Sequence, residues 1–307
     1  MTQNINNLIH GRESYIVYFG DSLIMKRPLP TLSADARDAW LAKQHKTKDA
    51  IDEIYAVGNP RYNIPRMIYI KDDEYQLLEE RAHGEPLTAQ LYATLTTRQR
   101  YEIIGSLAQF LVDMNELKPA DDGIMHKISD ELKMQRLENI INNKMPKWFN
   151  VGEIKYVSDL IEDVNTIEYK TRKAWSHCDL NSGNVLYDPT TSKISFIDFA
   201  EADYNFIFRD IFSPLAIDLD ICRPLYEEYY KLHNTEKYRI YGPRNPELQN
   251  IMRYRTITVL LKRFTKAGDD LRVNAKTKKS KRNNIEKIMF MRELIAKIQN
   301  IEKQLTK

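Results

Sequence analysis

One stretch constrains this chain more than any other: residues 176 to 188, which read SHCDLNSGNVLYD. Four residues separate Asp179 from Asn184, and His177 lies two residues before the Asp. A short apolar strand follows, and after the turn DPTTSK a second strand should end at Asp198, 14 residues beyond Asn184. A hairpin returns the chain to its starting edge, so we expect Asp198 to lie near the polar loop.

This spacing suits phosphoryl transfer. The reaction needs a carboxylate for the attacking hydroxyl, oxygen ligands for Mg²⁺ and a cation on the nucleotide phosphates. Kinases supply the first two from a loop with Asp, four residues and Asn, followed by a second metal-binding Asp. We therefore predict Asp179 as the catalytic carboxylate, and Asn184 and Asp198 as Mg²⁺ ligands. His177 is expected to orient the loop. The alternative is a set of polar residues that cap turns.

The N-terminal residues favour a small sheet with one helix. Strands are expected around the turn Gly20-Asp21, and again in NIPRMIYI and EYQLLEE, between residues 63 and 80. A helix is expected over residues 34–57. The composition shift near residue 82 predicts a β-rich lobe, 1–82, with a hinge at about 79–83.

Beyond the hinge the pattern becomes helical. An apolar stripe of helical period runs through residues 96–117, and nearly everything after Asp210 has helical character. We therefore predict a helical lobe, 83–307, that carries the catalytic loop and the acceptor site. The expected fold class is α+β, with two lobes and a cleft between them.

At these residues the chain resembles the aminoglycoside phosphotransferase and choline kinase superfamily. SHCDLNSGNVLYD and ISFIDFAEADYNFIFRD are similar to the family's His-Gly-Asp-x-x-x-x-Asn and Ile-Asp-Phe motifs, with Cys178 in place of the usual Gly. Asp210 stands where the family has a later Asp and is expected to brace the catalytic loop. LLEERAHGEPL resembles the family's hinge through Glu80 and Gly84. The resemblance covers about residues 11–215. It implies a protein-kinase-like fold and a kinase that uses Mg²⁺ with ATP or GTP.

The same resemblance implies the residues of the nucleotide site. Lys26 closes the strand LIMK and is expected to pair with the α- and β-phosphates; the alternative is an exposed strand-end lysine. In such kinases a helix acid holds this lysine, and Asp49, Asp52 and Glu53 all fall in the expected helix, with Glu53 preferred. The hinge backbone from Glu80 to Ala82 is expected to bind the adenine edge.

The expected acceptor is a small-molecule hydroxyl. Asp210 follows only 12 residues after Asp198, no Ala-Pro-Glu follows, and no Arg precedes Asp179, so a peptide-binding activation segment is not expected. The resemblance implies an aminoglycoside-like, amino-alcohol or sugar acceptor. A cationic acceptor needs carboxylates or aromatic faces. Candidates for that pocket, or alternatively for solvated helix faces, are Glu201, Asp203, Tyr204, Asp218, Asp220, Tyr226, Glu227, Glu228, Tyr229 and Tyr230.

Other function classes remain as alternatives. A catalytically inactive nucleotide-binding relative would usually lack part of the Asp179, Asn184 and Asp198 set, and a protein kinase is disfavoured as above. The basic segment 272–284 is expected to be an exposed loop, with phosphate or RNA binding as the alternative. The net charge of +3 does not favour nucleic acid as a partner.

Hydropathy, the number of cysteines and the C-terminal helix bear on cellular location and assembly. No window approaches 18 consecutive apolar residues, and the N-terminus lacks a basic start followed by an apolar run. With two cysteines, a reduced, cytoplasmic protein without a membrane partner is expected. The C-terminal helix expected at 285–306 has a wide apolar face, which either packs on its own domain or forms a homodimer.

Overall fold

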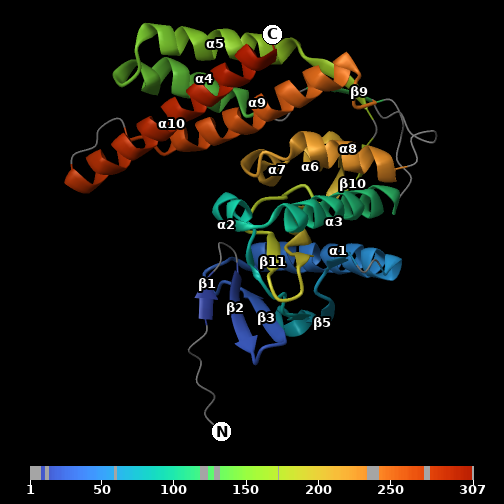
Figure 1. Ribbon diagram of the computed structural model, residues 1–307. Helices are drawn as coiled ribbons and strands as arrows, with labels where there is room; N and C mark the ends of the chain where they lie inside the picture. The colour runs from blue at the N-terminus through green and yellow to red at the C-terminus, as the bar shows by residue number, and fades with distance from the viewer. Residues whose placement is uncertain are drawn as a thin grey trace. The chain divides into compact units, whose positions relative to one another are not determined.

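A computed structural model of the chain describes residues 8–10, 14–58, 61–117, 124–127, 132–171, 173–233, 242–272 and 277–305. The chain divides into two compact units, one of Met1–Asp121 with Lys173–Lys237 and one of Asp122–Arg172 with Tyr238–Lys307 (Figure 1). Both the β-rich part and the catalytic motif belong to the first unit. The lobe boundary expected near residue 82 is not a border between these units and stays a prediction.

The first unit begins with a five-stranded antiparallel sheet in the order β1-β2-β3-β6-β5. Its strands are β1 (Leu8–His10), β2 (Ser14–Phe19), β3 (Leu23–Pro28), β5 (Met67–Lys71) and β6 (Gln76–Glu80). Both hairpins expected from the sequence are therefore present. Gly20 has a φ of 62° in the β2–β3 turn, a conformation that glycine adopts without strain.

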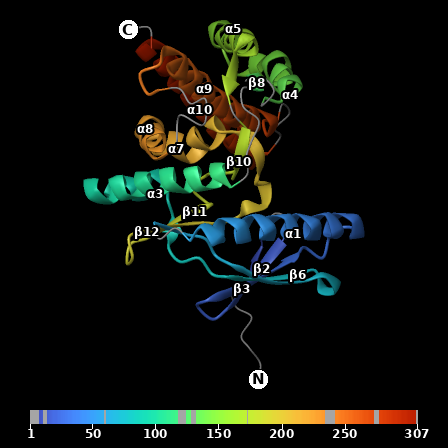
Figure 2. The same ribbon diagram turned by 90° about the vertical axis from the view of Figure 1, so that its right-hand side faces the viewer.

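Helix α1 (Ala34–Val57) lies along one face of this sheet (Figures 1 and 2). It begins where the Ser33 hydroxyl accepts a hydrogen bond from the Ala36 amide, and it ends at Gly58, which has a φ of 65°. Its buried residues include Trp40, Ile51 and Ile54. The expected helix and its bounds are confirmed.

The remainder of the first unit is mainly helical. Its long helices are α3 (Thr97–Glu116) and α8 (Cys222–Leu232), which pack together, and shorter ones are α2 (Ala89–Thr94), α6 (Phe208–Ile211) and α7 (Pro214–Asp218). A capping box between Thr96 and Gln99 starts α3. Buried aromatic rings fill the interior; Phe110 of α3, for example, stacks on Phe196 with ring centroids 3.6 Å apart.

Two small sheets hold the catalytic segment. One has the order β4-β12-β11-β7, and the other pairs β10 with β13. The strands are β4 (Tyr62–Asn63), β7 (Glu85–Pro86), β10 (Lys173–Ser176), β11 (Val185–Asp188), β12 (Lys193–Phe196) and β13 (Asp203–Phe206). The β11–β12 hairpin was expected. Strands β4, β7, β10 and β13 were not, because two to four residues without a clear alternation give little periodic signal.

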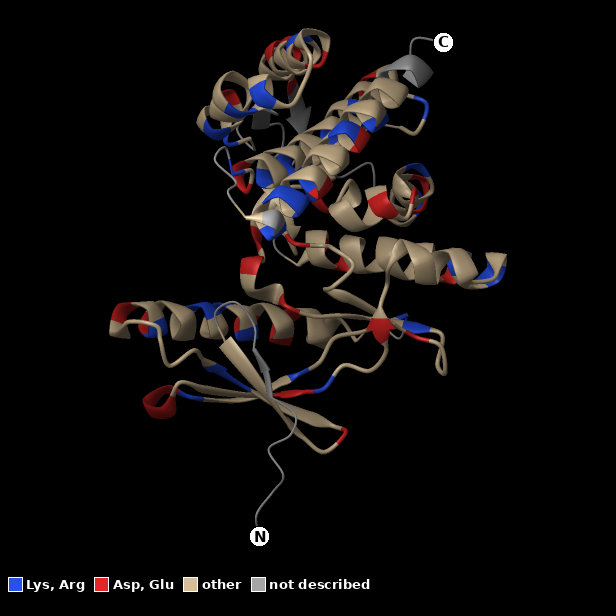
Figure 3. Cartoon of the chain, turned by 90° about the vertical axis from the view of Figure 1, so that its left-hand side faces the viewer, with Lys and Arg blue, Asp and Glu red and all other residues tan. Residues whose placement is uncertain are grey.

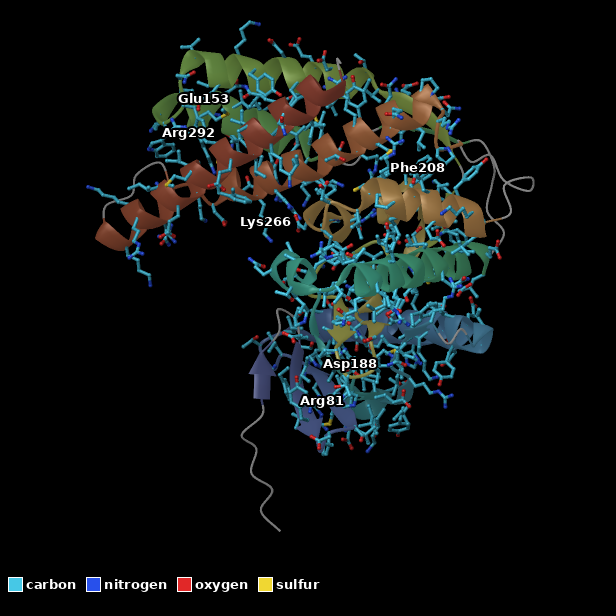
Figure 4. The ribbon with its side chains drawn as sticks, in the orientation of Figure 1. Arg81, Glu153, Asp188, Phe208, Lys266 and Arg292 are labelled. Carbon is cyan, nitrogen blue, oxygen red and sulfur yellow. The ribbon has the colours of Figure 1, made fainter. Side chains whose placement is uncertain are left out.

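The second unit is helical apart from one strand pair. It contains β8 (Ile124–Lys127), α4 (Met134–Asn139), α5 (Val151–Thr166), β9 (Glu168–Thr171), α9 (Pro246–Asp269) and α10 (Lys278–Leu305). The apolar face of α10, which includes Ile288, Met291, Leu294, Ile295 and Ile298, is buried, and α10 packs on α9. Arg292 of α10 also pairs with Glu153 of α5 at 3.0 Å (Figure 4). A homodimer through this helix stays a prediction.

The basic segment is partly helical, which corrects the expectation of a loop. Residues 273–276 lie outside the described residues, but α10 begins at Lys278, after the Thr277 hydroxyl accepts a hydrogen bond from the Ser280 amide. Figure 3 shows Lys and Arg along the long helices of this unit. Among the helices in the described ranges, none has the length and apolar character needed to cross a membrane.

Candidate active site

The catalytic loop is held by a buried carboxylate. Asp210, in α6, accepts hydrogen bonds from the backbone amides of His177, at 2.6 Å, and Cys178, at 3.0 Å. Burial raises the pKa of Asp210 above the ordinary value for an aspartate, against the N–H donors that favour its ionised form. Arg209 donates to the Cys178 carbonyl at 3.0 Å. These contacts explain how Cys178 is kept at a φ of 66°, and they fit the expected bracing role of Asp210.

His177 is fully buried and joins the loop to the strand that leads to Asp198. Its Nε2 lies 3.0 Å from the carbonyl oxygen of Ile197, so this nitrogen must carry the proton. The other ring nitrogen, Nδ1, then accepts a hydrogen bond from the Asp179 amide at 3.3 Å. A neutral imidazole in this tautomer satisfies both contacts. The expected orienting role of His177 is therefore consistent with its geometry.

Asn184 fixes the side chain of Asp179. Its Nδ2 donates to the Asp179 carbonyl and to Asp179 Oδ2, each at 2.9 Å. The side chain of Asn181 shapes the turn between them, because Oδ1 accepts from the Gly183 amide and Nδ2 donates to the Asp179 carbonyl. Asp179 is thus partly buried, with one carboxylate oxygen restrained by a neighbour.

The β11–β12 hairpin brings Asp198 back to this loop. The Ile197 amide, one residue before Asp198, donates to the Asn184 carbonyl at 3.0 Å. Asp198 itself is exposed and has a φ of 61°, so the chain turns sharply there into the short helix η5 (Phe199–Glu201). At the far end of the hairpin, Asp188 caps the turn through the Thr190 amide and the Thr191 hydroxyl (Figure 4).

The oxygen atoms left over at this loop fit a hard cation. Among the described residues, no hydrogen bond uses Asn184 Oδ1 or the carboxylate of Asp198. Mg²⁺ is bound in such enzymes by one or two protein oxygens together with water and substrate phosphates. Within the described residues, no group of three His, Cys, Asp or Glu side chains could hold a metal ion by itself.

Lys26 of β3 forms an ion pair with Glu79 of β6, with Nζ 2.5 Å from Oε1. Burial lowers the pKa of Lys26, but Glu79, and to a smaller extent Asp198, more than offset this, so the pKa is raised above 10.5. The sequence had favoured a helix acid, Glu53, as the partner of Lys26.

Backbone hydrogen bonds hold the first two residues of the hinge, Glu80 and Arg81. The Glu80 amide donates to the Arg66 carbonyl, and the Arg81 amide donates to the carbonyl of Ser22 in the β2–β3 turn (Figure 4). Within the described part of the chain, no hydrogen bond uses the backbone of Ala82. Gly84 has a φ of 112°, and a Cβ there would lie 2.5 Å from the Tyr187 carbonyl oxygen. The motif glycine therefore lets the hinge pack against β11.

Helix α1 is attached to the segment that follows Asp198. Lys43 pairs with Glu201 at 2.6 Å, and Lys46 pairs with Asp203 at 3.3 Å. Lys46 also lies over the ring of Trp175, 5.7 Å from its centroid. These contacts between distant parts of the chain were not foreseen, because each lysine in the sequence is one of many on a polar helix face.

Most residues suggested for a cation pocket have other roles. Besides Glu201 and Asp203, Glu227 pairs with Arg223 and Glu228 pairs with Lys231. Tyr226 and Tyr229 are buried in the core, where the Tyr229 hydroxyl donates to Asn115 Oδ1 at 2.9 Å. These four carboxylates therefore lie in ion pairs and these two tyrosines in the core, and the cation pocket stays a prediction.

A groove of about 1240 Å³ in the first unit lies away from these groups. It is lined by residues at the start of α3, by Arg61 and by the β11–β12 turn residues Thr191 to Lys193. None of the candidate catalytic, metal or nucleotide residues contributes to its lining. This groove is therefore not part of the candidate active site.

Comparison with known proteins identifies the family. Residues 5–241 match the phosphotransferase enzyme family. A probable ethanolamine kinase A of Dictyostelium discoideum is 40% identical over 55 residues, a match that spans 16% of this chain and 16% of that protein.

Solved structures share the fold. The GDP complex of aminoglycoside 2'-phosphotransferase-IIIa has a TM-score of 0.63 at 13% identity, covering 96% of this chain and 94% of that one. A choline/ethanolamine kinase family protein from Mesorhizobium loti has a TM-score of 0.59 at 10% identity, covering 99% and 94%. The protein-kinase-like fold expected from the motifs is confirmed, and the chain belongs to the phosphotransferase enzyme family.

Proposed function

We propose that this chain is a small-molecule kinase that transfers the γ-phosphoryl group of ATP or GTP to a hydroxyl of an aminoglycoside-like, amino-alcohol or sugar acceptor. The observation that carries the proposal is the hydrogen bond by which Asn184 restrains the Asp179 side chain. The Asn184 carbonyl in turn accepts from the Ile197 amide, next to Asp198. Membership of the phosphotransferase enzyme family supports it. So do the names of related proteins, which include aminoglycoside phosphotransferases and ethanolamine kinases.

Each group has a defined part in the transfer. Asp179 orients the acceptor hydroxyl and accepts its proton as the oxygen bonds to the γ-phosphorus, and the bond to the nucleoside diphosphate breaks. Asn184 Oδ1 and Asp198 would hold Mg²⁺, which neutralises charge on the phosphate oxygens. Lys26 binds the α- and β-phosphates, and the open backbone of Ala82 binds the adenine edge.

The segment after Asp198 favours a small acceptor over a protein. The 12 residues to Asp210 are taken up by η5, by β13 and by the start of α6, so little chain is left to form a peptide-docking segment. The complete set of Asp179, Asn184 and Asp198 likewise favours an active enzyme over an inactive nucleotide-binding relative.

The test is an acceptor panel. Purified protein with Mg²⁺ and ATP or GTP is mixed with aminoglycosides, choline, ethanolamine and sugars, and nucleoside diphosphate release is measured. We expect release with one acceptor class, and a loss of about 10³-fold in Asp179→Ala. Asp188→Ala is the matched control on the same hairpin and should retain turnover. Nucleotide binding without turnover on any acceptor would favour the inactive relative, and no nucleotide binding would exclude the kinase.

A further inference from the structure

We propose that Glu79 is the positioning residue for Lys26, in the place where a helix acid was expected. The inference rests on the proposed function, because Lys26 is the cation assigned to the nucleotide phosphates. It assigns to a strand of the sheet a task that the sequence suggested for α1.

Strand register sets the pair. Lys26 lies opposite Leu77 and Ile24 lies opposite Glu79 in the antiparallel β3–β6 ladder. Lys26 and Glu79 are therefore diagonal neighbours on the same face, within reach of two long side chains. Leu77, between them on that face, is fully buried, so the ion pair sits on the inner face of the sheet. The Lys26 and Glu79 side chains are only 20% and 12% exposed.

Helix α1 presents no carboxylate among its buried residues. Its buried polar residues are Gln44 and Thr47, and Glu53, the acid preferred from the sequence, is half-buried. Asp49 and Asp52 are exposed, and Asp52 pairs with Lys48. The helix is instead attached to the catalytic segment through its own lysines, Lys43 and Lys46.

The consequence is that the phosphate-binding cation is preorganised by a partner within the sheet. Adjacent hydrogen-bonded strands hold Lys26 and Glu79 at a fixed separation whatever the position of α1. Glu79 directly precedes Glu80, the residue at which β6 ends and the hinge follows. One strand, β6, would therefore connect adenine binding to the placement of Lys26.

A structure of the protein with Mg²⁺ and the nucleotide analogue AMP-PNP tests the geometry. We expect Lys26 Nζ to contact a phosphate oxygen and to keep its contact with Glu79. Transfer of Lys26 to Glu53 or another acid of α1 would overturn the inference and leave the proposed function standing. Failure of the wild-type protein to bind nucleotide at all would overturn the proposed function, and this inference with it.

Steady-state kinetics test the role of Glu79. The reaction measured is transfer to the acceptor found with the panel or, if the panel gives none, slow hydrolysis of the nucleotide. In Glu79→Gln we expect kcat to fall about 10- to 100-fold, because an ammonium misplaced by about 1 Å loses transition-state contact. The nucleotide KM should stay within about 3-fold, which a distorted hinge would not allow. Glu79→Asp should restore part of the loss, since it keeps the charge.

Two further variants make the test specific. Glu74→Gln is the matched control, since Glu74 pairs with Arg27 on the opposite face of β3, and it should behave as wild type. In the background of Lys26→Met, adding Glu79→Gln should lower kcat by less than about a further 3-fold, because both substitutions remove the same interaction. Wild-type kcat in Glu79→Gln, or additive losses in the double variant, would show that Glu79 does not act through Lys26.

Discussion

Cys178 is the residue of the catalytic loop whose backbone conformation suits its side chain least. Its φ of 66° lies in the left-handed region, where a Cβ costs about 1–2 kcal/mol. Hydrogen bonds from its amide to Asp210 and from Arg209 to its carbonyl hold it there. Glycine, which is usual at this position in the family, adopts this conformation without that cost because it has no Cβ.

A pair of substitutions measures that strain. Cys178→Gly relieves it but loses about 0.5–1 kcal/mol through a more flexible unfolded chain, whereas Cys178→Ala keeps it. We expect the Gly variant to be about 0.5–1 kcal/mol more stable than the Ala variant in chemical denaturation. Equal stability of the two would mean that the loop relaxes without cost.

Asp210 acts at the same scale but through its two oxygens. In Asp210→Asn the amide nitrogen would face a backbone N–H, leaving one buried donor without an acceptor. We expect the free energy of unfolding to fall by about 1–3 kcal/mol, and turnover to fall with it because the loop loses its brace. Urea denaturation and the panel assay measure both, with Asp188→Asn at the exposed turn as control. Unchanged turnover in Asp210→Asn would argue against bracing.

At the scale of elements, the hinge depends on close contact between backbones. The contact of Gly84 with the Tyr187 carbonyl positions β7 against β11, next to the loop that carries Asp179. Because backbone atoms cannot move aside as a flexible side chain does, a larger residue there must displace the hinge.

Gly84→Ala should therefore be destabilising by about 1–3 kcal/mol and should raise the nucleotide KM. Gly105→Ala is the matched control, since Gly105 lies in α3 with open space around the added Cβ, and it should be neutral or up to about 1 kcal/mol stabilising. Thermal unfolding and nucleotide titration measure the pair. Similar behaviour of both variants would contradict the contact.

At the scale of the whole molecule, the second unit depends on the packing of α10 within its own chain. Neighbouring methionines of this helix differ sharply: Met291 is 0% exposed and Met289 is 57% exposed. Met291→Ala should lower the free energy of unfolding by about 2–5 kcal/mol, and Met289→Ala should change it by less than about 0.5 kcal/mol. Denaturation of both variants over a range of protein concentrations measures this. A large, concentration-dependent effect at Met289 would instead indicate a dimer.

The sequence by itself determined several of the longer elements and the polar loop. Helical periodicity located α1 and α3, turn residues located the β2–β3 and β11–β12 hairpins, and spacing singled out Asp179, Asn184 and Asp198. These features are readable because they depend on residues close together in the chain, where periodicity and turn geometry leave few alternatives.

Only the tertiary structure decided the partners. The pairing of Lys26 with Glu79 depends on strand register, and the contact of Asp210 with His177 and Cys178 joins segments more than 30 residues apart. The ion pairs of Glu201 and Asp203 with α1 are likewise contacts between segments more than 150 residues apart. Such contacts are set by how strands align and helices pack, and one carboxylate in a sequence looks like any other until its neighbours are in place.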